Sequence, residues 1–138
     1  MEKKKKVAKF DYKTIKTFED ACKKENIDPT KLPDVSMIPE EFHKPIVAAY
    51  KLYVIFKAIN NGWTPYWNDS SEYKYYPWFW VNASKEKPSG FGFSSSDCDF
   101  TTTGTGVGSR LCVQTSEEAL YIAGQFTAEY LDFLLIIK

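Results

Sequence analysis

Aromatic side chains are concentrated in one short part of this chain. Twelve of the 38 residues at positions 63–100 are aromatic, and they include all four tryptophans. The densest stretch, residues 73–80, carries six of them. One strand of a small core rarely needs this much aromatic surface, and such rings can fill a core, stack on a flat ligand or meet another protein. This segment therefore constrains the fold and is also the first candidate for a binding surface.

Length and charge indicate one domain with a basic extension. A chain of 138 residues fits a single domain and can bury about two thirds of its extended surface, so it needs no disulfide or metal to fold. The net charge is zero, yet residues 1–16 hold seven lysines against two acids. We expect residues 1–6 to form a flexible basic arm and residues 7–138 to form the domain.

The cysteines and the apolar segments indicate the cellular compartment of the protein. Cys22, Cys98 and Cys112 are odd in number and widely spaced, which fits neither a disulfide framework nor a metal knuckle. We therefore expect no metal and no cofactor. The lysine-rich start has no apolar core behind it, unlike a secretory signal, and the apolar stretch at 46–56 is too short to span a bilayer. These features predict a soluble cytoplasmic protein without membrane contact.

Two helices have clear start signals. Thr17, followed by acids, predicts an N-cap and a helix over 17–25. Thr115 and Glu118 fit a capping box that opens a helix over 116–135. The predicted buried stripe of this last helix is Ala119, Ile122, Ala123, Phe126, Tyr130, Leu131 and Leu134.

A longer helix is predicted to start near Glu40 and to reach Asn60. Pro45 should bend it, or mark where a short turn hands over to the main helix. Asn61 and Gly62 supply a left-handed stop. Its predicted buried face is Phe42, Ile46, Ala49, Tyr50, Tyr53, Phe56 and Ile59.

The rest of the chain reads as strands and turns. Strands are predicted at 73–82, 91–103 and 110–114, with turns at 85–90 and 104–108. The fold expected is α+β: two N-terminal helices, a three-stranded antiparallel sheet, and a C-terminal helix packed on it. Pro77 lacks a ladder donor, so the first strand should lie at an edge or carry a bulge.

Alternation divides the aromatic strand into two faces. Tyr76, Trp78 and Trp80 share one face, and one of the two faces should lie under the last helix. We expect Trp78 and Trp80 to be structural, because they are strand residues, and loop tryptophans to bind, because loops often carry binding residues. The candidate binding residues are Trp63, Tyr66, Trp67, Tyr73, Tyr75 and Phe79.

Other functions have weaker support in the sequence. Single-stranded nucleic acid could stack on the aromatics, but residues 63–100 hold five acids against three lysines. That alternative would need the arm for salt-sensitive contacts, through Lys3, Lys4, Lys5 and Lys6. A second alternative is a small ligand, a nucleotide or a sugar, with the aromatic loop as a pocket wall.

Catalytic and metal sites are less well indicated. The only histidine, His43, fits a surface or cap role. The glycines at 104–108 precede a predicted strand rather than opening a helix, as a phosphate loop would. Asp97 and Asp99 could hold a cation with Asp69, but no defined calcium loop is present. No acid–base pair, triad or metal set stands out, so we expect a protein that is not an enzyme.

Five phrases carry a resemblance: TFEDAC at 17–22, IDP at 27–29, NGWTP at 61–65, EYKYYPWF at 72–79 and GSRLC at 108–112. Together they resemble a family of short uncharacterised proteins of gut Bacteroidetes and of their phages and mobile elements, over most of residues 17–135. The family has no established activity and assigns no site residues. The resemblance implies a phage-linked protein in the bacterial cytoplasm or on a virion. With the aromatic segment, it predicts a non-enzymatic protein that uses an aromatic surface for protein binding or self-association.

Overall fold

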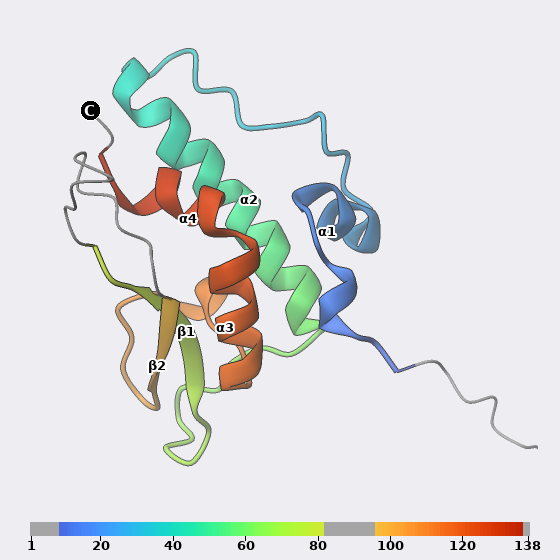
Figure 1. Ribbon diagram of the computed structural model, residues 1–138, viewed down its shortest axis with the longest axis vertical. Coiled ribbons are helices and arrows are strands. Elements are labelled where there is room, and N and C mark those ends of the chain that lie inside the picture. The colour runs from blue at the N-terminus through green and yellow to red at the C-terminus, as the bar shows by residue number, and fades with distance from the viewer. Residues whose placement is uncertain (1–8, 82–95, 137–138) are drawn as a thin grey trace, which may run out of the picture.

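The computed structural model describes residues 9–81 and 96–136, which form an α+β arrangement of helices packed on a small sheet (Figure 1). The described α-helices are Phe18–Glu25 (α1), His43–Asn60 (α2), Ser116–Gln125 (α3) and Thr127–Leu134 (α4). The strands are Lys74–Phe79 (β1) and Ser96–Thr101 (β2). Three 3-10 turns lie at Tyr12–Thr14 (η1), Glu40–Phe42 (η2) and Ser109–Leu111 (η3). The predicted arm at 1–6 and turn at 85–90 lie outside the described residues, as does the start of the predicted second strand.

The predicted helix starts are confirmed by their hydrogen bonds. The Thr17 hydroxyl accepts from the backbone N–H of Asp20, whose carboxylate accepts from the N–H of Thr17. The Thr115 hydroxyl accepts from the N–H of Glu118 and donates to the Glu118 carboxylate at 2.8 Å, so Thr115 caps α3 without the reciprocal bond of a capping box. These side chains satisfy donors that the first turn of a helix leaves unpaired.

The handover expected near Pro45 is also present. The short turn η2 ends at Phe42 and α2 begins at His43, so Pro45 lies in the first turn of α2. Backbone N–H groups there need no helical partner, and proline is tolerated. At the other end, Asn61 (φ 46°) and Gly62 (φ 91°) adopt the left-handed conformation that ends the helix.

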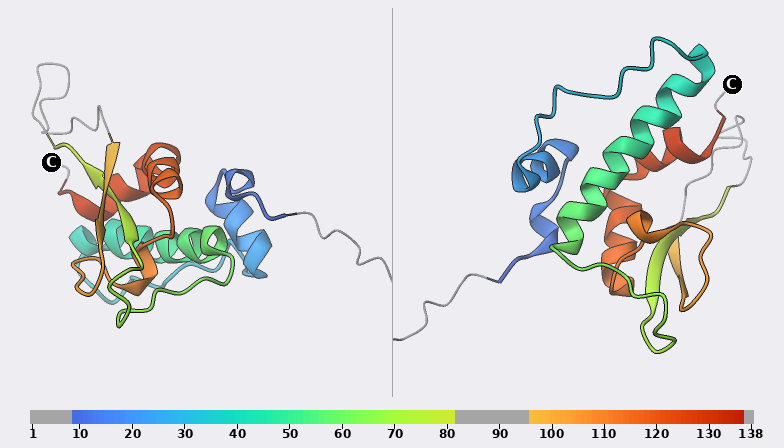
Figure 2. Two further views of the ribbon diagram at one scale, coloured as in Figure 1. Left: turned by 90° about the horizontal axis from the view of Figure 1, so that it is seen from below. Right: turned by 180° about the vertical axis from the view of Figure 1, so that it is seen from behind.

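Helix α2 runs through the middle of the molecule, with α1 packed on one side and α4 on another (Figure 2). Phe56 and Ile59 are buried as predicted, but Phe42, Ile46 and Tyr53 are exposed, so that part of the prediction is wrong. Apolar residues occur nearly all round this helix, and periodicity alone could not choose among the possible faces. The observed buried set is Ala48, Leu52, Val54, Ile55, Phe56, Ala58, Ile59 and Asn60.

The described sheet has two strands rather than the predicted three. β1 and β2 pair antiparallel, from Lys74 opposite Thr101 to Phe79 opposite Ser96. In place of a third strand, the turn η3 takes up residues 109–111, and only Val113 pairs with β1. Its N–H donates to the C=O of Tyr75 at 2.8 Å, and its C=O accepts from the N–H of Tyr75 at 2.9 Å. The predicted third strand is thus reduced to one bridge on the far side of β1 from β2.

The predicted C-terminal helix is two helices. The backbone leaves helical geometry at Phe126 (φ −115°, ψ 35°), and the Thr127 hydroxyl donates to the carbonyls of Ala123 and Gly124. Such a bond back to the preceding turn bends helices. Consequently α3 packs on both strands and α4 packs on α2. Phe126 and Tyr130 are buried as expected, whereas Leu134, at 50% exposed, is not.

Candidate binding surfaces of the aromatic segment

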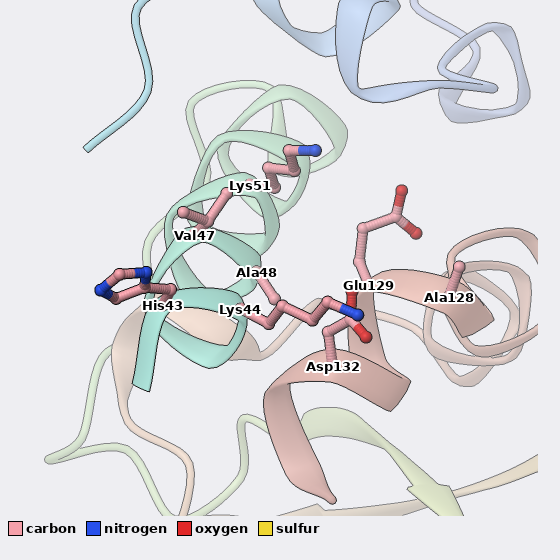
Figure 3. A pocket seen from close by; sticks show the side chains of 8 residues that line it. All are labelled: His43, Lys44, Val47, Ala48, Lys51, Ala128, Glu129 and Asp132. Atoms are coloured by element: carbon pink, nitrogen blue, oxygen red, sulfur yellow. The ribbon is translucent and has the colours of Figure 1, made fainter. Parts of the chain in front are cut away.

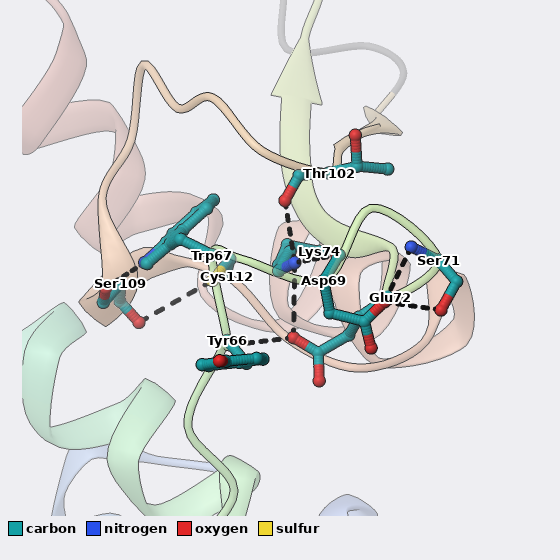
Figure 4. A network of polar contacts seen from close by, with 9 residues as sticks. All are labelled: Tyr66, Trp67, Asp69, Ser71, Glu72, Lys74, Thr102, Ser109 and Cys112. Carbon is teal, nitrogen blue, oxygen red and sulfur yellow. Dashed lines mark hydrogen bonds and ion pairs between the residues drawn. The ribbon is translucent and has the colours of Figure 1, made fainter.

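A buried lysine organises the loop that precedes β1 (Figure 4). The Lys74 side chain is 0% exposed, and its ammonium group donates to the backbone carbonyls of Asp69 at 3.1 Å and Thr102 at 2.7 Å. It also pairs with the Glu72 carboxylate at 3.4 Å. A buried charge is tolerated when it is paired and hydrogen-bonded. These contacts tie residues 69–72, β1 and the segment after β2 to one another.

Trp67 belongs to this buried network. Its ring lies 5.3 Å from the Lys74 ammonium, within the range of a cation–π contact. Its indole N–H donates to the Ser109 hydroxyl at 2.8 Å. The same Glu72 carboxylate accepts from the backbone N–H of Tyr66 at 2.8 Å. Trp67, predicted as a binding residue, is therefore engaged in holding its own loop against η3.

The other predicted binding residues do not form one surface. Tyr66, in the loop before β1, is 60% exposed. Tyr73 is exposed and packs on Phe100, with ring centroids 4.7 Å apart, and half-buried Tyr75 adjoins both rings. Phe79 is buried and packs on Tyr130 at 4.9 Å, so it is a core residue because it faces the helices.

The exposed tryptophans are the two expected to be structural. Trp78 is 39% and Trp80 is 49% exposed, and their rings meet edge to face with centroids 4.6 Å apart. Tyr76 lies on the same face of β1, opposite Asp99 on β2. Burial, and then the negative charge of Asp99, raises the pKa of the Tyr76 hydroxyl. We call Tyr76, Trp78 and Trp80 the outer aromatic face.

Trp63 contributes to a different feature, a cleft of about 860 Å³ between the C-terminal ends of α1 and α2 and the turn η3. We call it the Trp63 cleft. Its wall includes two aromatic side chains, three cations and a buried amide, namely Tyr53, Trp63, Lys24, Lys57, Arg110 and Asn60. Of these, only Trp63 is among the binding residues predicted from the sequence. Arg110 is the only arginine of the chain, which could have drawn attention to it.

A second, smaller pocket of about 390 Å³ lies between α2 and α4 (Figure 3). It contains His43, Glu129 and Asp132, but the imidazole points away from both carboxylates, and Lys44 is the side chain that reaches toward Asp132. The His43 Nε2 atom lies 2.8 Å from the Ile38 carbonyl, to which it can donate. That contact ties His43 to the loop before η2 and is not a helix cap, and the pocket brings no acid–base pair together.

Metal and phosphate sites find no support among residues 9–81 and 96–136. No group of three or more histidine, cysteine or acidic residues is close enough there to hold a metal ion, and the side chain of Asp97 lies outside the described set. Cys22 and Cys112 are buried free thiols. In the glycine turn, the Thr105 hydroxyl accepts from the N–H groups of Val107 and Gly108. Those two donors are therefore occupied within the turn.

No family model, curated protein or solved structure matches this chain. In the part of the chain that the structure describes, no helix has the length and apolar character needed to cross a bilayer.

Proposed function

We propose that this is a non-enzymatic protein that self-associates through the outer aromatic face. The observation that carries this proposal is the exposure of Trp78 on β1 and of Trp80 just after it, whose rings pack edge to face on the side opposite to Phe79. Interface cores are enriched in tryptophan and tyrosine. Large, rigid rings of this kind are common anchors of binding energy.

The edges of the sheet are poor sites for association. Tyr75 directs its backbone groups to Val113, and hydrogen-bonding directions alternate along a strand, so Pro77 faces the same edge. Pro77 has no N–H to offer there. On the outer edge of β2, the N–H of Phe100 donates to the Asp99 carboxylate at 2.7 Å. Proline and acidic groups on edges oppose strand addition, which favours contact through the face.

A second copy of the chain is the partner that charge favours. The net charge of zero removes long-range repulsion between copies. The seven lysines of residues 1–16 also balance an acidic excess elsewhere in the same sequence. The resemblance to phage-linked proteins gives this proposal a setting, the bacterial cytoplasm or a virion.

Sedimentation velocity across a range reaching about 100 μM tests the proposal. We expect the wild-type mass to rise with concentration and the double variant Trp78→Ala/Trp80→Ala to remain a monomer. Tyr66→Ala removes an aromatic ring of greater exposure elsewhere and should behave like wild type. A wild-type chain that stays monomeric throughout, or a double variant that associates like wild type, would show that the proposal is wrong.

A further inference from the structure

We infer that the Trp63 cleft binds a small phosphate-bearing ligand with a flat ring, of the nucleoside phosphate class. This inference is independent of the outer aromatic face, because the cleft lies against α1, α2 and η3 rather than on the sheet. Its volume of about 860 Å³ falls within the roughly 300–1,000 Å³ usual for small-molecule sites.

The charges that line the cleft favour an anion. Lys57 on α2 and Arg110 on η3 are exposed and form no ion pair with another described residue. Lys24 lies over the Phe10 ring at 4.6 Å, and Glu25 is the one acid in the lining. The C-terminal ends of α1 and α2 each add about half a negative charge. The three cations therefore still leave an excess of positive charge after Glu25 and both helix ends are counted. Guanidinium and ammonium groups are both frequent phosphate-binding groups.

The aromatic lining suits a flat ring. Trp63 is half-buried, and its backbone N–H donates to the Asn60 carbonyl at 2.9 Å, which fixes the start of the loop against α2. Tyr53 also lines the cleft and is 42% exposed. Rings held in this way can stack on a base, since every base presents a π-face. An inorganic anion alone would leave this surface unused.

The cleft wall also includes an acceptor without a partner. Asn60 is 7% exposed, and its amide N–H donates to the Cys112 carbonyl at 2.9 Å. That bond fixes the orientation of the amide, because the reverse orientation would place two oxygens together. The Asn60 Oδ1 atom is buried without a hydrogen-bond partner among the described residues. Buried acceptors are costly to leave unpaired, and a ligand hydroxyl or amine that reached this oxygen would satisfy it.

Isothermal titration calorimetry with ADP, GDP, CDP and UDP tests the inference. We expect saturable binding of at least one of them. The corresponding nucleoside and pyrophosphate should each bind at least about tenfold more weakly, because each keeps only part of the contacts. Arg110→Gln and Lys57→Gln should each weaken binding about tenfold. Lys44→Gln, which changes an exposed cation of the other pocket, should leave it unchanged.

Trp63→Leu should also weaken nucleotide binding, and Trp63→Phe should retain most of it. A thermal melt of each variant checks that the fold persists, and the glutamine variants keep the test valid if Trp63→Leu unfolds. Absence of saturable binding of all four diphosphates at about 1 mM would overturn the inference. So would pyrophosphate binding as tightly as the nucleotides, with no effect of Trp63→Leu.

Discussion

The indole ring of Trp67 lies 5.3 Å from the ammonium nitrogen of Lys74 and covers a charge that has no access to solvent. Trp67 lies in the loop and Lys74 lies at the start of β1, yet their side chains form one unit in space. The loop at 63–72 owes its shape to this unit, because its carbonyl at Asp69 and its carboxylate at Glu72 both bind the same ammonium group. The aromatic segment is consequently part scaffold and part surface.

Lys74→Met should destabilise the protein by about 1–3 kcal/mol. Methionine fills a similar volume, but the carbonyls of Asp69 and Thr102 lose their donor, and a buried acceptor left unpaired costs this much. Urea unfolding followed by circular dichroism measures the change. Lys44→Met, at an exposed position, is the control and should shift stability by less than about 0.5 kcal/mol. A more stable Lys74→Met variant would mean that the buried charge costs more than its bonds return.

Phe126→Ala should cost about 3–5 kcal/mol. The ring is 1% exposed and lies where α3 passes into α4, so its loss leaves a cavity between both helices and their neighbours. Leu134→Ala is the matched control from the same predicted stripe. Since Leu134 is 50% exposed, its truncation should cost less than about 1 kcal/mol. Equal losses for the two variants, measured by urea unfolding, would contradict this assignment of the buried face.

The sequence predicted those parts of the fold that depend on local hydrogen bonding. The caps at Thr17 and Thr115 and the left-handed stop at Asn61 are decided within a few residues, and all three are confirmed. The break at Phe126 was missed because no proline marks it, and Gly124, two residues earlier, is itself helical. It accompanies a bond from the Thr127 hydroxyl to the Ala123 carbonyl, which a threonine can make or not make according to its surroundings.

The candidate site was harder to predict, because burial in this segment depends on contacts far apart in the chain. Trp67 is held by Ser109, 42 residues away. In β1, the alternation of side chains cannot show that one end of a strand face is covered while the other end is open. Lys74 and Trp78 share a face of β1, yet the first is 0% and the second 39% exposed. The lone charge of Lys74 inside an aromatic strand was the available signal of a buried partner network.

Stability should fall at alkaline pH, in part through Cys112. Burial raises the pKa of its thiol to about 11, from an ordinary value of 9.0. Above pH 9 the unfolded chain loses this proton while the folded chain keeps it, so stability decreases until pH passes 11, by up to about 2–3 kcal/mol. Burial also raises the pKa of Tyr130, which adds a further loss above about pH 10.

Urea unfolding under reducing conditions at a series of pH values measures this dependence. Cys112→Ala should lose less stability than wild type between about pH 9 and pH 11, whatever its stability at neutral pH. Identical slopes for Cys112→Ala and wild type would show that this thiol ionises equally well in the folded state.

The loop residue Trp67 should be structural and Trp80 should be a surface residue, which is the reverse of the sequence prediction. Trp67→Ala removes the cover of the Lys74 ammonium and the bond to Ser109, so we expect a loss of about 2–4 kcal/mol. Trp80→Ala removes a ring that is 49% exposed and packs edge to face on Trp78. It should cost less than about 1.5 kcal/mol, which is the most that an aromatic pair usually contributes beyond its buried area. Urea unfolding of both variants gives the two values. A larger loss for Trp80→Ala than for Trp67→Ala would restore the original assignment, with Trp80 in the scaffold and Trp67 free to bind.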